Sequence, residues 1–158
     1  MRKIFSVITA VLIAFSLSTE SFAAAKSAVL IDSESGRVLF EHNKDEKLPM
    51  ASTTKIMTAL IVLEEENIDE YFSVKKSDIA VEGSSMGLLP GDKVTLRILA
   101  SGMLLASGND AANAAAIRIS GSVENFVKLM NKRAKEMGLQ NTSFETPSGL
   151  DGKNHFSP

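Results

Sequence analysis

Two strand-like runs are followed by four segments in which apolar residues recur every three or four positions, as they do on helices that pack against a core. Residues 28–32 and 37–42 are rich in Val, Leu, Ile and Phe, and the turn-forming sequence Ser33–Gly36 between them predicts a β-hairpin. The expected helices are residues 52–66, 95–106, 110–119 and 122–138. This order predicts a mixed α/β (α+β) fold, in which a helical block accompanies an antiparallel sheet that two strands alone leave incomplete.

The expected helix at residues 52–66 contains no Gly or Pro, and Ser52 or Thr53 can cap its first turn. Helical spacing places four of its apolar residues on one side: Ile56, Met57, Leu60 and Leu63. We expect Gly102 to break the helix at residues 95–106, because glycine destabilises helix interiors.

Residues 1–23 have the pattern of a secretory signal peptide. Arg2 and Lys3 precede an uncharged apolar run, and Ser21–Ala23 ends in a small-x-small sequence. The apolar run is shorter than the about 20 residues that span a bilayer, although an uncleaved membrane anchor is the alternative. We therefore expect cleavage, a mature chain of residues 24–158, and an extracytoplasmic location, either secreted or in the cell envelope.

Composition excludes several kinds of site. The chain has no cysteine, which rules out disulfides, thiolate metal sites and cysteine nucleophiles. Its two histidines, His42 and His155, are far apart in sequence, so we expect no metal site. Lys and Arg number 17 against 19 Asp and Glu, so no basic surplus favours nucleic acid.

Ser52 and Lys55 are three positions apart at the expected start of a helix, so their side chains lie one turn apart on the same side. An uncharged lysine amine there can take the serine proton and make the serine a nucleophile. The positive end of the helix dipole disfavours a second cation and favours an alkoxide. The spacing alone is weak evidence, because a helix cap beside an exposed lysine has the same pattern. Ser73 and Lys76 repeat it in a polar, strand-like stretch that we interpret as solvated surface.

Ser107-Gly108-Asn109 separates two apolar helical segments. Such a break is usually a plain corner between helices with an N-cap. A Ser-x-Asn sequence inside an apolar block can also hold a hydroxyl and an amide in a cleft. We therefore consider this corner together with Ser52 and Lys55 as a candidate site.

Together these motifs resemble the serine D-alanyl-D-alanine carboxypeptidases, low-molecular-mass penicillin-binding proteins that share a fold with serine β-lactamases. The similarity extends from about Ala28 to Phe156. It rests on ordered matches at residues 51–58, 83–87, 90–92, 107–112, 126–127, 130–131, 142–144, 149–151 and 155. The resemblance implies a β-lactamase/transpeptidase-like fold, of whose catalytic domain residues 24–158 would form the N-terminal part.

The resemblance also implies roles for the site residues. Ser52 would be the acyl-accepting nucleophile, Lys55 its general base, and Ser107 a relay that carries a proton to the leaving amine. Asn109 would hydrogen-bond the substrate and help to hold Lys55. The implied substrate is a peptidoglycan stem peptide ending in D-Ala-D-Ala, which would lose its terminal D-alanine. β-Lactam antibiotics would be covalent inhibitors, and no metal or cofactor is implied.

The chain departs from the family in one motif. The sequence Lys-Thr-Gly or Lys-Ser-Gly, which the family carries on a sheet strand, does not occur. We expect a truncated chain rather than a degenerate relative, because the preceding motifs are intact. A missing oxyanion donor predicts weak acylation, and an uncovered hairpin predicts aggregation. The resemblance leaves open a peripheral membrane association through a C-terminal part beyond this chain.

Other functions compete with this interpretation. A class A β-lactamase deacylates with a glutamate, for which Glu145 is a candidate, although its neighbours resemble the carboxypeptidases. A non-catalytic peptidoglycan-binding module is an alternative from another class, and a secreted helical adhesin is a third. Neither His42 nor His155 has a role in the implied scheme, and we expect both at the surface or in loops.

Overall fold

The computed structural model describes residues 25–150, 152 and 154–158. The predicted signal peptide, residues 1–23, lies outside these residues. The chain forms two compact units, which divide between Lys44 and Asp45. Within the described residues, no helix has both the length and the apolar character that crossing a bilayer requires.

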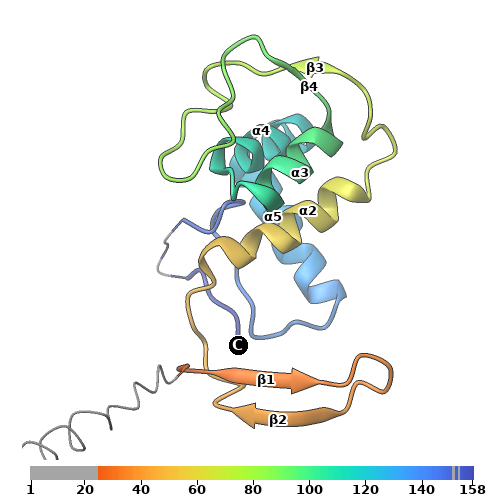
Figure 1. Cartoon of the computed structure of the whole chain (residues 1–158), viewed down its shortest axis with the longest axis vertical. Helices are drawn as coiled ribbons and strands as arrows, with labels where there is room; N and C mark the ends of the chain where they lie inside the picture. The colour runs from red at the N-terminus through yellow and green to blue at the C-terminus, as the bar shows by residue number, and fades with distance from the viewer. Residues whose placement is uncertain (1–24, 151, 153) are drawn as a thin grey trace, which may run out of the picture. The chain divides into compact units, whose positions relative to one another are not determined.

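The first unit contains the predicted hairpin, in which β1 (Ala28–Ile31) pairs antiparallel with β2 (Val38–His42) (Figure 1). Leu30 faces Phe40 across the two strands, and the register shifts at the end of β1. Large apolar side chains on both strands are exposed: Val29, Leu30, Ile31, Val38, Leu39 and Phe40. Two strands therefore form the hairpin without a buried face.

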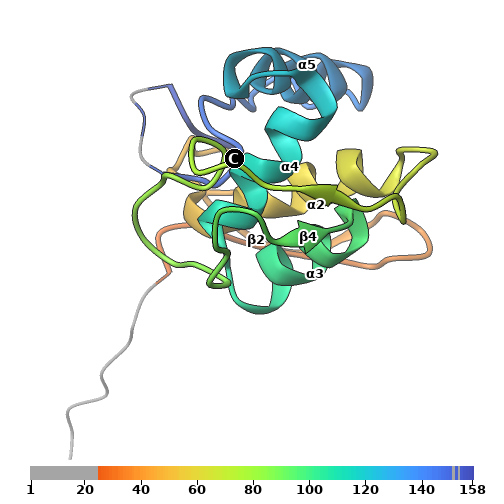
Figure 2. The same cartoon turned by 90° about the horizontal axis from the view of Figure 1, so that it is seen from above.

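The second unit is a helical block. Its helical elements are η1 (Ala51–Thr53), α2 (Thr54–Leu63), α3 (Leu96–Leu105), α4 (Asn109–Ser120) and α5 (Val123–Glu136). α2 packs against the other three α-helices, and α4 packs against α3 and α5 (Figures 1 and 2). A short antiparallel ladder of β3 (Phe72–Ser73) and β4 (Lys93–Val94) lies between α2 and α3 in sequence.

Thr95 and Ser122 cap the starts of α3 and α5, each accepting a hydrogen bond from the backbone N–H three residues later. The predicted cap of α2 by Ser52 or Thr53 is wrong. A 3-10 turn precedes that helix, and the hydroxyl of Thr53 donates to the carbonyl of Met50 instead.

The apolar spacing of α2 does not by itself identify its buried face. Met57 is buried, but Ile56 is 65% exposed. The buried side also carries Lys55 and Thr58, which donate hydrogen bonds to the carbonyls of residues 147–148. Polar side chains can be buried there because the segment opposite supplies acceptors.

The predicted break at Gly102 is wrong, since α3 is continuous through this residue. A Cβ at Gly102 would overlap the sulfur of Met86. Glycine at position 102 therefore allows the loop that carries Met86 to pack closely against α3, although glycine lowers the stability of a helix interior.

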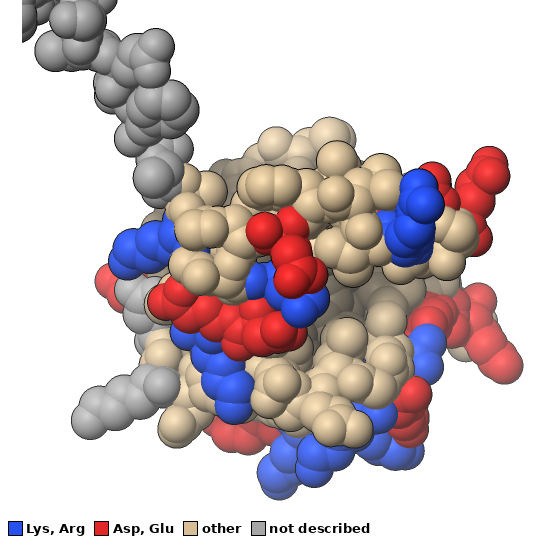
Figure 3. All heavy atoms as spheres, turned by 90° about the horizontal axis from the view of Figure 1, so that it is seen from below, with Lys and Arg blue, Asp and Glu red and all other residues tan. Residues whose placement is uncertain are grey.

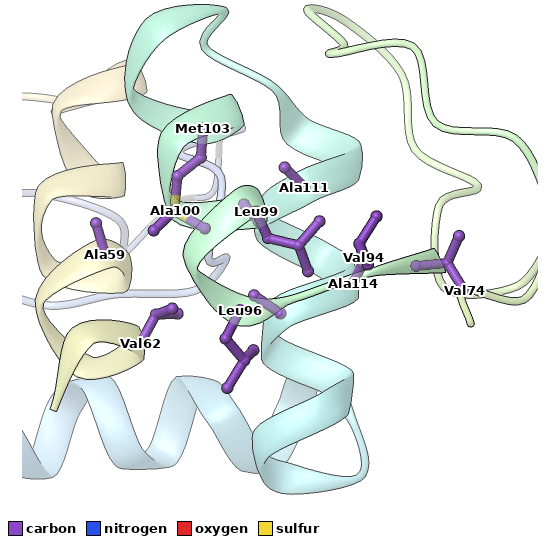
Figure 4. Close-up of a cluster of buried hydrophobic side chains, with 12 residues drawn as sticks. Ala59, Val62, Val74, Val94, Leu96, Leu99, Ala100, Met103, Ala111 and Ala114 are labelled. Atoms are coloured by element: carbon purple, nitrogen blue, oxygen red, sulfur yellow. The ribbon is translucent and has the colours of Figure 1, made fainter. Parts of the chain in front are cut away.

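The main core of the helical block lies where α2, α3 and α4 meet, with Val94 of β4 at its side (Figure 4). Leu99 and Met103 supply the large side chains, and small alanines of α4 let the helices approach closely. Lys, Arg, Asp and Glu side chains are interspersed on the face shown in Figure 3.

Candidate active site

Ser52 lies in η1, directly before the first turn of α2, and is exposed. The preceding residue, Ala51, has a φ of 46°, in the left-handed region that a residue with a Cβ rarely adopts. Strain of this kind persists only where the surrounding contacts enforce it, and it is common at functional sites. It places the Ser52 hydroxyl at the N-terminal end of a helix.

Lys55 is buried in the first turn of α2, with only 2% of its surface exposed. Its Nζ lies 3.3 Å from Ser52 Oγ and donates to the carbonyl of Ser148 at 2.7 Å. None of the ion pairs among the described residues involves Lys55. Burial without a carboxylate partner lowers the pKa of Lys55, which favours the neutral amine that can act as a base.

Ser107 lies in the turn between α3 and α4 and has a φ of 53°. Its hydroxyl donates to Ser52 Oγ at 2.9 Å, across 55 positions of sequence. The predicted corner between two helices is therefore present, and it also brings a second hydroxyl to Ser52.

Asn109 is buried at the start of α4. Its side-chain amide donates to the carbonyl of Glu82, and its backbone N–H donates to the carbonyl of Ser84, both at 2.7 Å. A Cβ on Gly83 would approach that amide to 2.7 Å. Asn109 thus holds the neighbouring loop, and among the described residues it makes no direct hydrogen bond to Lys55.

A cavity of about 260 Å³ opens at Ser52. Residues 51–52, 83–84, Asn109 and residues 148–150 line it. Four segments far apart in sequence therefore line one space, which is large enough for part of a peptide, is open to solvent and has both polar and apolar lining.

The segment of residues 145–149 forms one wall of this site. Thr58 Oγ1 donates to the carbonyl of Pro147 at 2.7 Å, one helical turn beyond Lys55. Gly149 has a φ of 84°, and a Cβ there would overlap the carbonyl oxygen of Ala51. Only glycine allows this backbone to pass so close to the turn that carries the serine.

His155 is buried, with 3% of its surface exposed, so of the two expected positions, surface or loop, it takes the loop. Its Nε2 lies 2.6 Å from Thr54 Oγ1, and its Nδ1 accepts from the backbone N–H of Glu145 at 2.9 Å. The residue does lie outside helices and strands, as predicted. His42, by contrast, is exposed in β2.

Asp110 is a buried carboxylate in the first turn of α4. It accepts hydrogen bonds from the hydroxyl of Ser85 and from the backbone N–H groups of Met86, Leu88 and Ala111. Burial alone would raise its pKa, but these four donors outweigh burial, and the pKa of Asp110 lies below its ordinary value. The carboxylate thereby fixes the loop that borders the cavity.

Glu145 does not line the cavity. Its carboxylate accepts from the side chain of Asn154, away from Ser52. The described residues also contain no cluster of carboxylates and histidines that could hold a metal ion.

The structure brings the predicted site residues together. Lys55 and Ser107 both hydrogen-bond Ser52 Oγ, and Asn109 lines the cavity that opens at Ser52. The second Ser-x-x-Lys sequence is not involved, because Ser73 at the end of β3 and Lys76 in the following turn are both exposed. Sequence reasoning missed the carbonyl of Ser148, the carboxylate of Asp110 and the imidazole of His155. No periodic pattern marks them, and only their place in the matched motifs could have drawn attention to them.

The chain matches the model of the peptidase S11 family, described as D-alanyl-D-alanine carboxypeptidase, over residues 14–158. It is 48% identical over 138 residues to D-alanyl-D-alanine carboxypeptidase DacF of Bacillus subtilis, an alignment that covers 84% of this chain and 36% of that protein. The chain thus spans little more than a third of this relative's length.

Solved structures give the same result. The D-alanyl-D-alanine carboxypeptidase DacD from Francisella tularensis superposes with a TM-score of 0.80 at 35% identity, covering 85% of this chain and 34% of that one. Penicillin binding protein 5 from Haemophilus influenzae gives a TM-score of 0.79 at 37% identity, covering 84% of this chain and 41% of that one. The predicted transpeptidase-like fold is confirmed by these similarities.

Proposed function

The chain belongs to the peptidase S11 family of D-alanyl-D-alanine carboxypeptidases, and from this premise we propose that it supplies the nucleophile and the base of a serine acyl transfer. One observation carries the proposal: Ser52 Oγ lies 3.3 Å from a buried lysine amine and 2.9 Å from a second hydroxyl, at the edge of a cavity. A serine needs a nearby base to become a nucleophile, and few arrangements other than catalysis require a buried lysine beside it.

In the proposed reaction, Lys55 Nζ takes the proton of Ser52 as Oγ attacks the carbonyl carbon of the penultimate D-alanine. The carbon–nitrogen bond then breaks, the hydroxyl of Ser107 passes its proton to the departing amine of the terminal D-alanine, and the proton held by Lys55 replaces it on Ser107. Water hydrolyses the resulting ester on Ser52 and regenerates the hydroxyl. Asn109 lines the cavity in which the substrate's peptide group would lie.

The substrate we propose is a peptidoglycan stem peptide ending in D-Ala-D-Ala, and β-lactams would acylate the same serine. The cavity is open to solvent and is lined by both polar and apolar groups, which suits an extended peptide. Substrates of this kind are found outside the cytoplasm, which agrees with the extracytoplasmic location expected from the sequence. Because the chain covers only part of its relatives' length, the activity of the whole protein is also part of what we propose.

Covalent labelling by a fluorescent penicillin tests the proposal. We expect weak labelling, in an adduct that mass spectrometry locates on the peptide containing Ser52, and we expect Ser52→Ala to abolish it. Ser73→Ala is the matched control, because Ser73 belongs to the second Ser-x-x-Lys sequence but lies at an exposed position. Labelling that persists in Ser52→Ala, or the lack of any adduct at Ser52 in the unaltered chain, contradicts the proposal.

The same assay separates the alternatives. Rapid release of hydrolysed penicillin without a long-lived adduct would indicate a β-lactamase-type hydrolase. Binding of muropeptides without acylation would indicate a non-catalytic peptidoglycan-binding module. Release of D-alanine from a synthetic peptide ending in D-Ala-D-Ala would support the carboxypeptidase directly.

A further inference from the structure

His155 is a buried titratable group that the proposed reaction does not use. It is 3% exposed and bridges two elements, because Nδ1 accepts from the backbone N–H of Glu145 and Nε2 lies 2.6 Å from Thr54 Oγ1. Thr54 is itself 1% exposed and directly precedes Lys55 in α2. The imidazole therefore joins the start of residues 145–149 to the helical turn that carries the base.

The hydrogen bonds define the protonation of the ring. The backbone N–H of Glu145 can only donate, so Nδ1 carries no proton. In a neutral imidazole the proton is then on Nε2, which donates to Thr54 Oγ1. One neutral tautomer thus satisfies both partners, whereas an imidazolium would direct an N–H at the N–H of Glu145.

Residues 145–149 are held against α2 by three such contacts. Besides the imidazole bridge, Thr58 donates to the carbonyl of Pro147, and Lys55 donates to the carbonyl of Ser148. The first two contacts do not depend on the charge of Lys55. These two contacts fix the segment so that the carbonyl of Ser148 stays 2.7 Å from Lys55 Nζ. The same packing keeps water away from the lysine amine.

We infer that His155 is a positioning residue, which holds residues 145–149 on α2 and thereby keeps Lys55 buried and directed at Ser52. The inference rests on the proposed role of Lys55 as the base. Removing the imidazole leaves the N–H of half-buried Glu145 and the hydroxyl of buried Thr54 without this partner. The segment then separates from the helix, water reaches Lys55, and the amine becomes easier to protonate.

The test is the pKa of Lys55, measured in the full chain from the pH dependence of its 13Cε and 15Nζ resonances. We expect His155→Ala to raise this pKa by about one unit, which lowers the neutral fraction of the amine, and the rate of penicillin labelling near pH 7, by about tenfold. His155→Gln should recover most of the shift, because one amide supplies both an acceptor and a donor. Val94→Ala, which truncates a buried core residue of β4, controls for a general loss of stability.

A pKa of Lys55 in His155→Ala that equals the value in the unaltered chain overturns the inference, as does an equal rise in Val94→Ala. If His155→Ala does not fold, Thr54→Val replaces it, with Thr54→Ser as the variant that keeps the hydroxyl. A rise in Thr54→Val alone supports the inference, and equal values in the two variants contradict it. Absence of a Ser52 adduct in the unaltered chain would instead refute the proposed function, while the pKa comparison still decides the role of His155.

Discussion

A lysine amine buried without a carboxylate is costly as a cation, and Lys55 is in that position. Its hydrogen-bond partners are a serine hydroxyl and a backbone carbonyl, neither of which carries a negative charge. The surroundings therefore favour the neutral amine that the proposed base requires, and they lower stability when the amine is charged. Activity and stability are commonly opposed in this way. The cost and the activity should both be measurable at this single residue.

Lys55→Met should abolish penicillin labelling and also change how stability depends on pH. The pKa of Lys55 is lowered in the folded chain, so between that value and the ordinary 10.5 the unfolded chain binds more protons, and stability rises with pH. The variant lacks this rise, so its free energy of unfolding relative to the unaltered chain should fall as pH rises toward 10. Urea titrations at several pH values measure it, with Lys76→Met as the exposed control. A constant difference would contradict the argument.

Asp110→Asn should weaken the loop beside the cavity. The new amide would direct its N–H atoms at groups that now donate hydrogen bonds to the carboxylate. We therefore expect the free energy of unfolding to fall by about 2–4 kcal/mol at neutral pH. The pKa of Asp110 is lowered, so its contribution is complete above the ordinary value of 3.8 and is lost as pH falls through the folded-state value. Asp78→Asn, which alters a surface turn, is the control. Unfolding midpoints that decrease equally in both variants would exclude this role of Asp110.

Local sequence signals predict the helices, but they do not predict the turn that carries Ser52. Residues 123–136 form a helix between the predicted cap at Ser122 and the stop at Gly138, because capping and left-handed glycine are local properties. α2 begins later than predicted, at Thr54, since a 3-10 turn carries Ser52. That turn depends on Gly149, almost a hundred residues away, and no local pattern reports such a contact.

Gly149→Ala should therefore disrupt the element that presents Ser52. Its Cβ would meet the carbonyl of Ala51, in addition to the strain of a φ of 84°. Gly121→Ala isolates the strain, because Gly121 has a φ of 76° and no atom lies near its Cβ position. We expect a loss of about 1–2 kcal/mol for Gly121→Ala and roughly 3–5 kcal/mol for Gly149→Ala, with labelling reduced only in the latter. Similar Tm values for the two variants would show that the close approach is unimportant.

At the scale of the whole molecule, the sequence predicts the classes of element better than their long-range contacts. Spacing alone left Ser52 and Lys55 as a helix cap and an exposed lysine, and the family resemblance was needed to connect them with Ser107. The hydrogen bond of Lys55 with Ser148 joins residues 93 positions apart, and that of Thr54 with His155 joins residues 101 positions apart. Hydrophobic periodicity identifies apolar faces but not the carbonyl that a buried polar side chain will reach.

The exposed hairpin is the part of the chain that we expect to drive association between copies. Leu30 and Phe40 face each other and are 56% and 58% exposed, on strands whose outer edges are unpaired within their two-stranded sheet. Unpaired edges with apolar side chains favour association between chains. We expect the chain to self-associate as its concentration rises, and expect Leu30→Lys with Phe40→Glu to reduce this, as measured by light scattering after size exclusion. Ile56→Lys, which removes an equally exposed apolar side chain from a helix, should leave association unchanged. A monomer at all concentrations, or an equal effect of Ile56→Lys, would show that the strand edges are not responsible.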